Sequence, residues 1–416
     1  MDRVSQCFLN SLRCALRGTA LDQPPKLGWE EWDLVFRMAG IHHVLPMVFE
    51  AVHALPELQA YPPLPALRRS VFRQVMIQTQ KTAEFLPLMQ ALADAGIRPL
   101  VVKGIVCRDL YPKPDHRISA DEDLLIEPAQ AAAYHNIFTQ YGLSSDMDPG
   151  LRDSAYEIPY WKEKGSLYIE LHRHLFPPES AAYGDLNRFF RGASHRAVCH
   201  TVNGIPVWSL EHTDHLFYLI CHAFKHFLHS GFGIRQVCDI IQYATAYGSH
   251  IQWDQLARNC RRIRALYFAA AIFRIGQNHL DFDPLKAGMP PVWLDISVDE
   301  GPMLEDLLQS GIYGGSSDSR RQSSNITLDA VAAQKQGRSA HGSLTASLFP
   351  SAGSLKGRYP YLKDRPWLLP VAWASRMGQY CKHTVRNKGA DAIQSLELGK
   401  HRLELLEQYR ILDRKQ

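Results

Sequence analysis

Short β-rich runs are confined to residues 96–208 of this 416-residue chain, and helical patterns flank that stretch on both sides. Within residues 1–95, apolar residues recur at helical spacing. The longest stripe covers about 66–95, and Pro87 is expected to kink that helix or split it in two. Further helical stripes follow from Leu210 onward. The pattern predicts an α+β fold, in which a small mixed sheet is flanked by N-terminal and C-terminal helical regions.

Four runs inside the β-rich stretch predict strands. They cover residues 98–103, 121–126, 155–161 and 166–172. The last two flank a Lys-Glu-Lys-Gly turn, which is typical of a hairpin. A helix is expected over 129–141, because Pro128 precedes it and Gly142 follows it.

The length exceeds that of one ordinary domain, so a division into parts is expected. Five parts are predicted: an N-terminal helical region (1–95), an α/β core (96–208), a helical domain (209–310), a flexible linker (311–348) and a C-terminal helical tail (349–416). The linker is assigned because Gly, Ser, Gln and Arg dominate it and large apolar side chains are few.

Composition limits the classes of function. Hydrophobic residues make up 46% and charged residues 21%, which is an ordinary globular mixture. The formal net charge of +4 is too small for a protein that coats nucleic acid. A small phosphate-rich substrate fits this balance as well as RNA does, so the charge alone leaves both open.

The eight cysteines are scattered and none forms a C-x-x-C pair, which argues against a zinc ribbon or a thioredoxin-like site. Reduced thiols in a cytoplasmic protein are expected. The N-terminal residues show no signal-peptide pattern, and no run of eighteen apolar residues occurs. A membrane span is therefore not expected.

The strongest chemical signal is Asp121-Glu122-Asp123 at the head of an apolar run. On a strand, Asp121 and Asp123 point to one face and Glu122 to the other. Two adjacent carboxylates repel each other, and a divalent cation removes that repulsion. Magnesium prefers such oxygen ligands together with substrate phosphates. The competing interpretation is a solvated acidic start of a strand.

Two neighbouring features favour the metal interpretation. Lys103 and Gly104 end the preceding strand and open a helix, a geometry in which backbone N–H groups face phosphates. Downstream, Glu170 shares a strand face with Tyr168 and His172 and offers a third carboxylate. Three carboxylates on neighbouring strands can hold the two metal ions of a nucleotidyl-transfer site. Glu157 competes with Glu170 for the third position, and the flanks of Glu170 are more strand-like.

A strand ending in a glycine turn, a helix, a strand with D-x-D and a later strand with an isolated carboxylate together resemble the polymerase-β nucleotidyltransferase superfamily. The chain is more closely similar to the family of uncharacterised nucleotidyltransferases. The residues that carry the resemblance are Val101-Val-Lys-Gly104, Leu110-Tyr-Pro112, Arg117, Asp121 to Ile126, Ile169-Glu-Leu-His172, His222 to His226, Arg235 and Asp239. Phe349-Pro350, Tyr359-Pro360, Leu368-Leu-Pro370, Trp373 and Arg376 extend it, so that it spans about residues 30–380.

Two features depart from the expected pattern. Glu122 stands where this family usually has an aliphatic residue, although outside the metal face. Lys103 and Gly104 stand where the wider superfamily carries Gly-Ser, whose serine helps to hold the triphosphate. Lys103 can replace that contact with a point charge.

The resemblance implies a catalytic and metal-binding set of Asp121, Asp123 and Glu170, two Mg²⁺ ions and a nucleoside triphosphate (NTP) substrate. Glu170 is expected to accept a proton from the acceptor hydroxyl, which attacks the α-phosphate and releases pyrophosphate. Lys103, Gly104 and Arg117 are expected at the phosphates. A solvated loop position is the alternative for Arg117, and simple packing is the alternative for His172 as a ligand-orienting residue.

The family's helical segment predicts a further binding surface. His222, Lys225 and His226 fall on roughly one helical face, together with His229. They line a substrate cleft or form a half-buried histidine face. A zinc site is a third interpretation, but the segment lacks the Glu of H-E-x-x-H. Arg235 and Asp239, four residues apart, form a helix ion pair or part of the same cleft.

The sequence thus predicts a magnesium-dependent, ATP-binding or other NTP-binding nucleotidyltransferase that acts on a hydroxyl of a small-molecule, sugar or peptide acceptor. A catalytically weak, nucleotide-binding regulatory protein on the same scaffold is the alternative. An RNA-modifying relative is a third hypothesis, supported by the arginines of 258–264 but disfavoured because basic residues are otherwise dispersed. The residues name neither the acceptor nor the base.

Overall fold

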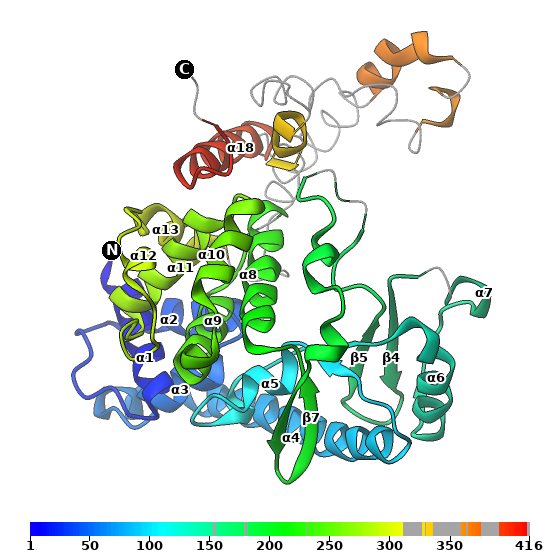
Figure 1. Ribbon diagram of the computed structural model, residues 1–416. Coiled ribbons are helices and arrows are strands. Elements are labelled where there is room, and N and C mark those ends of the chain that lie inside the picture. The colour runs from blue at the N-terminus through cyan, green and yellow to red at the C-terminus, as the bar shows by residue number, and fades with distance from the viewer. Residues whose placement is uncertain are drawn as a thin grey trace. The chain divides into compact units, whose positions relative to one another are not determined.

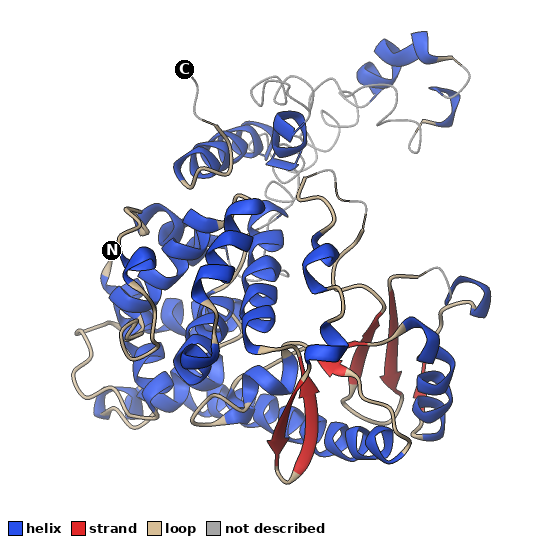
Figure 2. Ribbon diagram, in the orientation of Figure 1, coloured by secondary structure: helices blue, strands red, loops and turns tan. Residues whose placement is uncertain are grey.

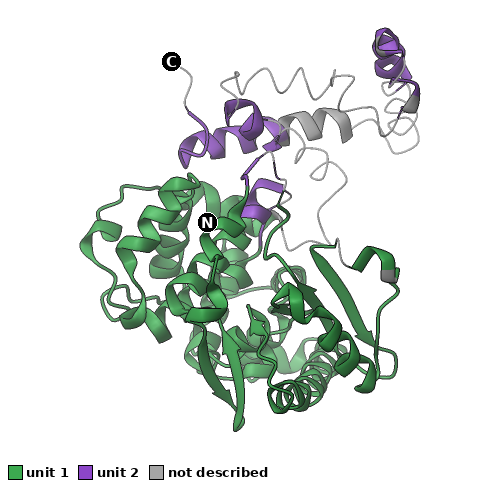
Figure 3. Cartoon of the chain, turned by 45° about the vertical axis from the view of Figure 1, so that its right-hand side comes forward, with its two compact units in different colours: residues 1–179, 185–223, 233–312 green, residues 180–184, 224–232, 313–416 purple. Residues whose placement is uncertain are grey.

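The computed structural model describes residues 1–152, 155–178, 180, 182–229, 231–310, 327–328, 330–335, 359–362, 365–375 and 391–413. The chain divides into two compact units, which Figure 3 colours separately. The first unit consists of residues 1–179, 185–223 and 233–312, and the second of 180–184, 224–232 and 313–416. The first unit contains both sheets.

The first unit begins with helices α1 (Arg3–Arg17), α2 (Trp29–Ile41), α3 (Leu45–Val52) and α4 (Leu64–Asp94). At the start of α1 the Asp2 side chain accepts a hydrogen bond from the Ser5 N–H at 2.8 Å. Gly18 ends that helix with φ at 72°, a backbone conformation that favours glycine. Pro87 lies inside α4 without ending it, so α4 is a single helix of 31 residues.

A five-stranded mixed sheet follows, with strand order β1-β2-β5-β4-β3. Its strands are β1 (Leu100–Val101), β2 (Glu122–Leu125), β3 (Leu143–Ser144), β4 (Glu157–Lys162) and β5 (Tyr168–His172). Strands β2 and β5 are parallel, and the other neighbours are antiparallel. Leu124, Ile169 and Leu171 are fully buried on one face of the sheet. Alternation along the strands puts Asp123 and Glu170 on the opposite face.

Short helices connect these strands: α5 (Gly104–Arg108) follows β1, while α6 (Ala131–Gln140) and α7 (Pro149–Arg152) flank β3. A separate hairpin of β6 (Val198–Val202) and β7 (Ile205–Ser209) packs through β7 against α4 and β1. Asn203 and Gly204 form its turn with φ values of 49° and 81°, as a tight hairpin turn requires.

Helices α8 (His212–His229), α9 (Ile234–Tyr247), α10 (Trp253–Arg262), α11 (Leu266–His279), α12 (Pro291–Leu294) and α13 (Gly301–Ser310) follow the hairpin. Within the first unit, α9 to α12 gather with α1 on one side, and β4, β5 and α6 lie on the other (Figure 1). The strands therefore lie beside a helical body (Figure 2).

In the second unit, α18 spans Asp391–Gln408, and residues 327–328 and 330–335 are helical. Tyr359, Leu362 and Ala372 form a buried cluster, against which Leu368, Leu369 and Trp373 pack. Most of the predicted linker (311–348) lies outside the described residues, as do Phe349, Pro350 and Arg376 of the family resemblance.

The expected α+β fold is confirmed, with a small mixed sheet flanked by helices. The strands predicted over 121–126 and 166–172 appear as β2 and β5, and the expected hairpin appears as β4 and β5. The five-part division of the chain stays a prediction. Across the described residues, no helix combines the length and the apolar character needed to cross a membrane.

Candidate active site

The parallel register of β2 and β5 brings two carboxylates together. Asp123 pairs directly with Glu170 in that register, so both side chains emerge from the same face of the sheet. Asp123 is 3% exposed, whereas Glu170 is partly exposed. The hydrogen bonds between β2 and β5 therefore hold two carboxylates that are distant in the sequence side by side, one of them buried and the other accessible.

His172 completes this group. Its Nε2 lies 3.1 Å from Oδ1 of Asp123 and 3.5 Å from Oε2 of Glu170. One ligand atom from each of the three residues lies within 4.8 Å of the others. Burial alone lowers the pKa of His172, but its hydrogen bonds to Asp123 and Glu170 outweigh that effect and raise the pKa to about 9. Without a metal ion, the imidazole is therefore protonated at neutral pH.

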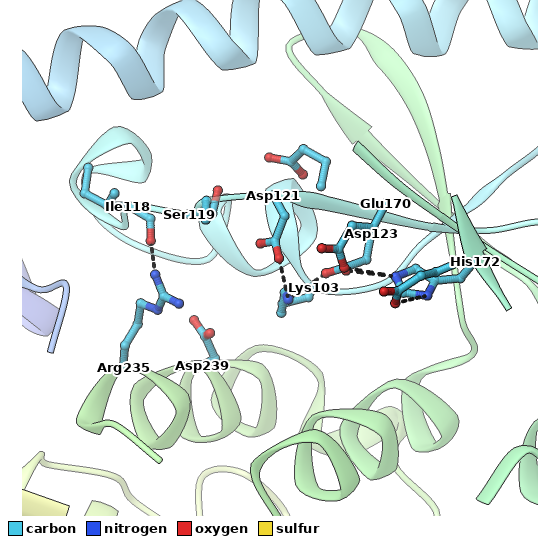
Figure 4. Close-up of polar contacts among 12 residues, drawn as sticks. Lys103, Ile118, Ser119, Asp121, Asp123, Glu170, His172, Arg235 and Asp239 are labelled. Atoms are coloured by element: carbon cyan, nitrogen blue, oxygen red, sulfur yellow. Dashed lines mark hydrogen bonds and ion pairs between the residues drawn. The ribbon is translucent and has the colours of Figure 1, made fainter. Parts of the chain in front are cut away.

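Lys103 contacts Asp123 through the carboxylate oxygen that does not face His172, as Figure 4 shows. Its Nζ lies 2.7 Å from Oδ2 of Asp123 and 3.7 Å from Oδ2 of Asp121. Burial alone lowers the pKa of Lys103, yet the two carboxylates raise it above its ordinary value. Burial likewise raises the pKa of Asp123, but Lys103 and His172 together bring it well below its ordinary value. Asp123 is thus ionised and held between two cations.

The turn that presents Lys103 is strained. Lys103 has φ at 89° and Gly104 has φ at 39°, and residues other than glycine rarely adopt such backbone angles. The Lys103 N–H faces Nε2 of His215 at 3.3 Å, and Oγ of Ser209 lies 2.6 Å from Nδ1 of that ring. A Cβ atom at Gly104 would overlap the carboxylate of Glu122. Two independent features therefore require glycine at position 104.

Glu122 points to the other face of the sheet, as its place between the two aspartates predicts. Its Oε1 accepts a hydrogen bond from Nη1 of Arg108 at 2.6 Å, and its Oε2 accepts one from the Ile105 N–H at 2.8 Å. Both charged side chains are 1% exposed. The carboxylate at this unusual position is therefore neutralised by an arginine of α5, and it fixes α5 against β2.

Helix α4 holds the loop that leads into β2. Nζ of Lys81 donates to the carbonyls of Ser119 and Ala120 at 2.7 and 2.6 Å, and these carbonyls immediately precede Asp121. Oε1 of Gln78 accepts from the Ser119 N–H at 2.8 Å. The loop before β2 is thereby fixed to α4.

Glu84 makes a matching contact one turn further along α4. Its Oε2 accepts hydrogen bonds from the N–H groups of Ser166 and Leu167, each at 3.2 Å, just before β5. Nothing in the local sequence marks Gln78, Lys81 or Glu84 as site residues, because the loops that they bind lie tens of residues away. In the sequence, their spacing of three residues indicates no more than a shared helical face.

Arg117 and Asp239 form a buried pair. Nε and Nη2 of Arg117 donate to the two carboxylate oxygens at 3.0 and 2.5 Å, and the Tyr111 hydroxyl donates to the same carboxylate at 2.7 Å. Arg117 is 1% exposed. Arg235, also on α9, donates to the Ile118 carbonyl. These contacts favour a structural role, in which α9 holds the loop before Asp121, over the predicted phosphate contact.

Helix α8 brings further side chains near the carboxylates. His215 meets the Lys103 backbone, and Tyr218 is buried close enough to interact electrostatically with both Asp123 and Lys103. The ring of His222 lies 5.9 Å from that of Tyr218. The sequence did not single out His215 or Tyr218, although both precede the histidine segment on the same helix. Lys225 and His226 belong to the second unit, so their predicted binding role stays a prediction.

Asp121 and Glu157 occupy secondary positions. Asp121 immediately precedes β2 and contacts Lys103, but it does not belong to the group formed by Asp123, Glu170 and His172. Glu157 on β4 pairs in register with His172, and its Oε2 lies 3.9 Å from Nδ1 of that ring. Glu157 and Glu170, the two candidates for the third carboxylate, therefore lie on the same face of the sheet, and Glu170 is the one adjacent to Asp123.

The donor set fits a divalent metal ion. Two carboxylates and one imidazole converge, and hard oxygen donors suit Mg²⁺ or Mn²⁺. Among the described residues, Nδ1 of His172 is buried without a hydrogen bond, so the ring is oriented chiefly by the two acids. Asp121, Asp123 and Glu170 lie near one another with Lys103 and a protonated His172 as partners, and a divalent cation would stabilise such a group of acids further.

The mixed sheet and the acidic group of Asp123, Glu170 and His172 fit a nucleotidyltransferase. The model of the family described as uncharacterised nucleotidyltransferase matches residues 29–281, and the chain belongs to that family. Membership classes the protein as an enzyme that transfers a nucleotidyl group, which implies an NTP substrate. Neither the search of curated proteins nor the search of solved structures gives a match.

Proposed function

We propose that this enzyme transfers a nucleoside monophosphate from an NTP to a hydroxyl of a small-molecule, sugar or peptide acceptor, with release of pyrophosphate. The observation that carries the proposal is the direct register pairing of Asp123 with Glu170 on parallel strands. Asp123, Glu170 and Asp121 would hold two Mg²⁺ ions, with His172 beside them. Bound magnesium supplies positive charge that stabilises the charge developing on the phosphate oxygens.

The exposure of each carboxylate suggests its role. Glu170 is 28% exposed at its side chain, whereas Asp123 is nearly buried, so Glu170 is the better placed to accept the proton of an incoming hydroxyl. Lys103 bears a full positive charge beside both aspartates and can transfer its contacts to phosphate oxygens. Asp121, which already shares Lys103 with Asp123, would complete the oxygen ligands.

A nucleotide-binding protein without catalysis is the second candidate. One observation favours it: Lys103 already neutralises Asp121 and Asp123, where the wider superfamily has a serine. In such a protein Lys103 would remain paired with the two aspartates, and no metal ion would be needed to neutralise them. NTP binding would then be independent of magnesium.

Calorimetric titration of ATP, GTP, CTP and UTP, with and without Mg²⁺, separates the two candidates. We expect at least one NTP to bind at least tenfold more tightly with Mg²⁺, and Asp123→Asn to abolish that gain. Asp94→Asn, an exposed aspartate at the end of α4, is the matched control and should behave as the wild type. Equal NTP affinity with and without Mg²⁺ would contradict the catalytic proposal and support the second candidate.

A further inference from the structure

A cavity of about 360 Å³ opens where β2 and β5 end. We propose that it binds the acceptor substrate, and that this acceptor is a small organic anion with an apolar body. The assignment of the cavity to the acceptor rests on the proposed function. Anion binding in the cavity can be tested by itself, without metal or nucleotide.

The floor of the cavity continues the face that carries the metal-binding group. Leu125 lines the cavity and pairs in register with His172 on β5 and with Leu100 on β1. It lies two residues beyond Asp123 on the same strand, so it shares the face of Asp123 at a distance of roughly 7 Å along β2. Leu125 therefore places this part of the lining on the sheet face that carries the carboxylates, although Asp123 and Glu170 do not themselves line the cavity.

The direction of the strand separates the two substrates. Lys103 contacts Asp121 and Asp123 at the start of β2, while the cavity lies at its end. In nucleotidyl transfer the attacking and leaving oxygens lie roughly in line on opposite sides of the phosphorus. If Lys103 holds the pyrophosphate portion, the attacking hydroxyl approaches from the cavity side.

The walls of the cavity are apolar below and cationic at the rim. Leu175 and Phe190 are buried side chains of the lining, and they join Leu125 in an apolar surface. Four arginines also line the cavity: Arg98, Arg173, Arg188 and Arg191. An apolar surface beneath guanidinium groups suits a molecule with a hydrophobic body and a phosphate or carboxylate group.

Three of these arginines have no carboxylate partner among the described residues. Within the part of the chain that the structure describes, Arg98, Arg188 and Arg191 form no ion pair with a carboxylate. The guanidinium of Arg98 lies over the Trp208 ring at 4.8 Å, and that of Arg188 lies over the Phe189 ring at 4.9 Å. The aromatic rings thus hold the guanidinium groups of Arg98 and Arg188 in place without cancelling their charge, which remains available to an anion.

The two carboxylates of the lining are already engaged. Glu127 accepts a hydrogen bond from the Ser194 hydroxyl, and Asp185 accepts one from the Asn187 N–H at 2.9 Å. These neutral donors orient the two acids, and the four arginines of the lining outnumber them by two, so the lining carries a surplus of positive charge. The volume lies near the lower end of the range for small-molecule sites, so the ligand is a small molecule and not a polymer.

The transfer step balances with this placement. The acceptor's hydroxyl oxygen forms a bond to the α-phosphorus, and the bridging P–O bond to the β-phosphate breaks with its electron pair on the leaving pyrophosphate. The hydroxyl proton passes to the Glu170 carboxylate. The anionic group of the acceptor stays at the arginine rim and takes no part in bond making.

Phenyl phosphate is a suitable probe, because it joins an apolar ring to an anion. Calorimetric titration of the full chain in a chelator, without nucleotide, should show phenyl phosphate binding at least tenfold more tightly than inorganic phosphate or phenol. The double variant Arg188→Glu with Arg191→Glu should lose at least tenfold in affinity. Arg69→Glu, an exposed arginine on α4 outside the cavity, should leave it unchanged. Equal affinity in the wild type and the double variant would overturn the site.

A second titration tests the assignment to the acceptor. A non-hydrolysable ATP analogue with Mg²⁺ should bind equally well with and without saturating phenyl phosphate, and equally well to the double variant. Competition between the two ligands would assign the cavity to the nucleotide and overturn the acceptor proposal. Failure of the proposed function would be seen separately, as an absence of magnesium-dependent NTP binding in a protein that still binds phenyl phosphate.

Discussion

The carboxylate of Asp123 lies between two positively charged groups, and one of them is the ammonium of Lys103 at 2.7 Å. The other, His172, belongs to the strand that also supplies Glu170. This arrangement keeps several acids close together in a protein without a metal ion. It also means that a divalent cation must replace charge that is already present, which makes the site sensitive to each neighbour of Asp123.

Loss of Lys103 should destabilise the metal-free protein. Lys103→Met leaves the buried Asp123 with one cation fewer, and breaking a buried pair costs about 3 kcal/mol. We expect urea unfolding in a chelator to show that loss and added Mg²⁺ to restore part of it. Lys113→Met, which removes an exposed pair with Glu50, should cost less than about 1 kcal/mol. A Lys103→Met variant as stable as the wild type in a chelator would contradict this reading.

Metal affinity should depend on pH through His172. Its pKa of about 9 lies above the ordinary value of 6.5, so the proton is bound throughout the neutral range and is lost as the pH rises through about 9. A bound cation opposes an adjacent imidazolium, so metal binding should release that proton. Mn²⁺ affinity should therefore rise between pH 6.5 and 9, by up to roughly tenfold per unit.

The measurement is an Mn²⁺ titration followed by electron paramagnetic resonance at several pH values. His172→Gln should flatten the dependence across this range, because no imidazole remains to titrate. A wild-type affinity that stays constant from pH 6.5 to 9 would show that His172 is not coupled to the cation.

The buried pair of Glu122 and Arg108 should behave as a unit. Glu122→Leu alone leaves Arg108 charged and buried, which costs about 3–5 kcal/mol. The double change Glu122→Leu with Arg108→Met replaces the pair by apolar side chains, and it should recover most of that loss. Chemical denaturation of the two single variants and the double variant forms the required cycle. Additive losses in the double variant would rule out direct coupling.

Lys81 should act on the metal site through the loop before β2. It binds the carbonyls of Ser119 and Ala120, so Lys81→Met frees the segment that leads into Asp121. We expect Mn²⁺ affinity to fall about tenfold, in line with the cost of losing supporting contacts around metal ligands. Lys81→Arg should recover part of the affinity. A purely structural role would instead lower the unfolding free energy and leave Mn²⁺ affinity unchanged.

Much of this site could be predicted from local pattern. The alternation in Asp121 to Ile126 and in Tyr168 to His172 predicts two strands whose acids share a face, and the structure pairs them in register. The strained φ of Lys103 and the side-chain pairing of that residue could not be predicted. Local sequence does not encode which distant cation meets a given carboxylate.

For the same reason, the sequence could not predict the Arg117–Asp239 pair or the cavity. Arg117 and Asp239 are 122 residues apart, and only the packing of α9 against the loop before β2 decides that they pair. The cavity depends on residues 185–194, where 3-10 helices η4 (Leu186–Phe190) and η5 (Ala193–Arg196) follow no periodic hydrophobic pattern. Such segments are shaped by tertiary contacts, which the sequence pattern does not reveal.

A crystal soaked with Mn²⁺ and a non-hydrolysable NTP analogue tests the metal site most directly. Anomalous diffraction should place a manganese peak within ligand distance of the carboxylates of Asp123 and Glu170, with the nucleotide's phosphates beside it. The Glu170→Gln variant should lose or weaken that peak. A bound nucleotide with no manganese between these two carboxylates, at a saturating metal concentration, would contradict the account.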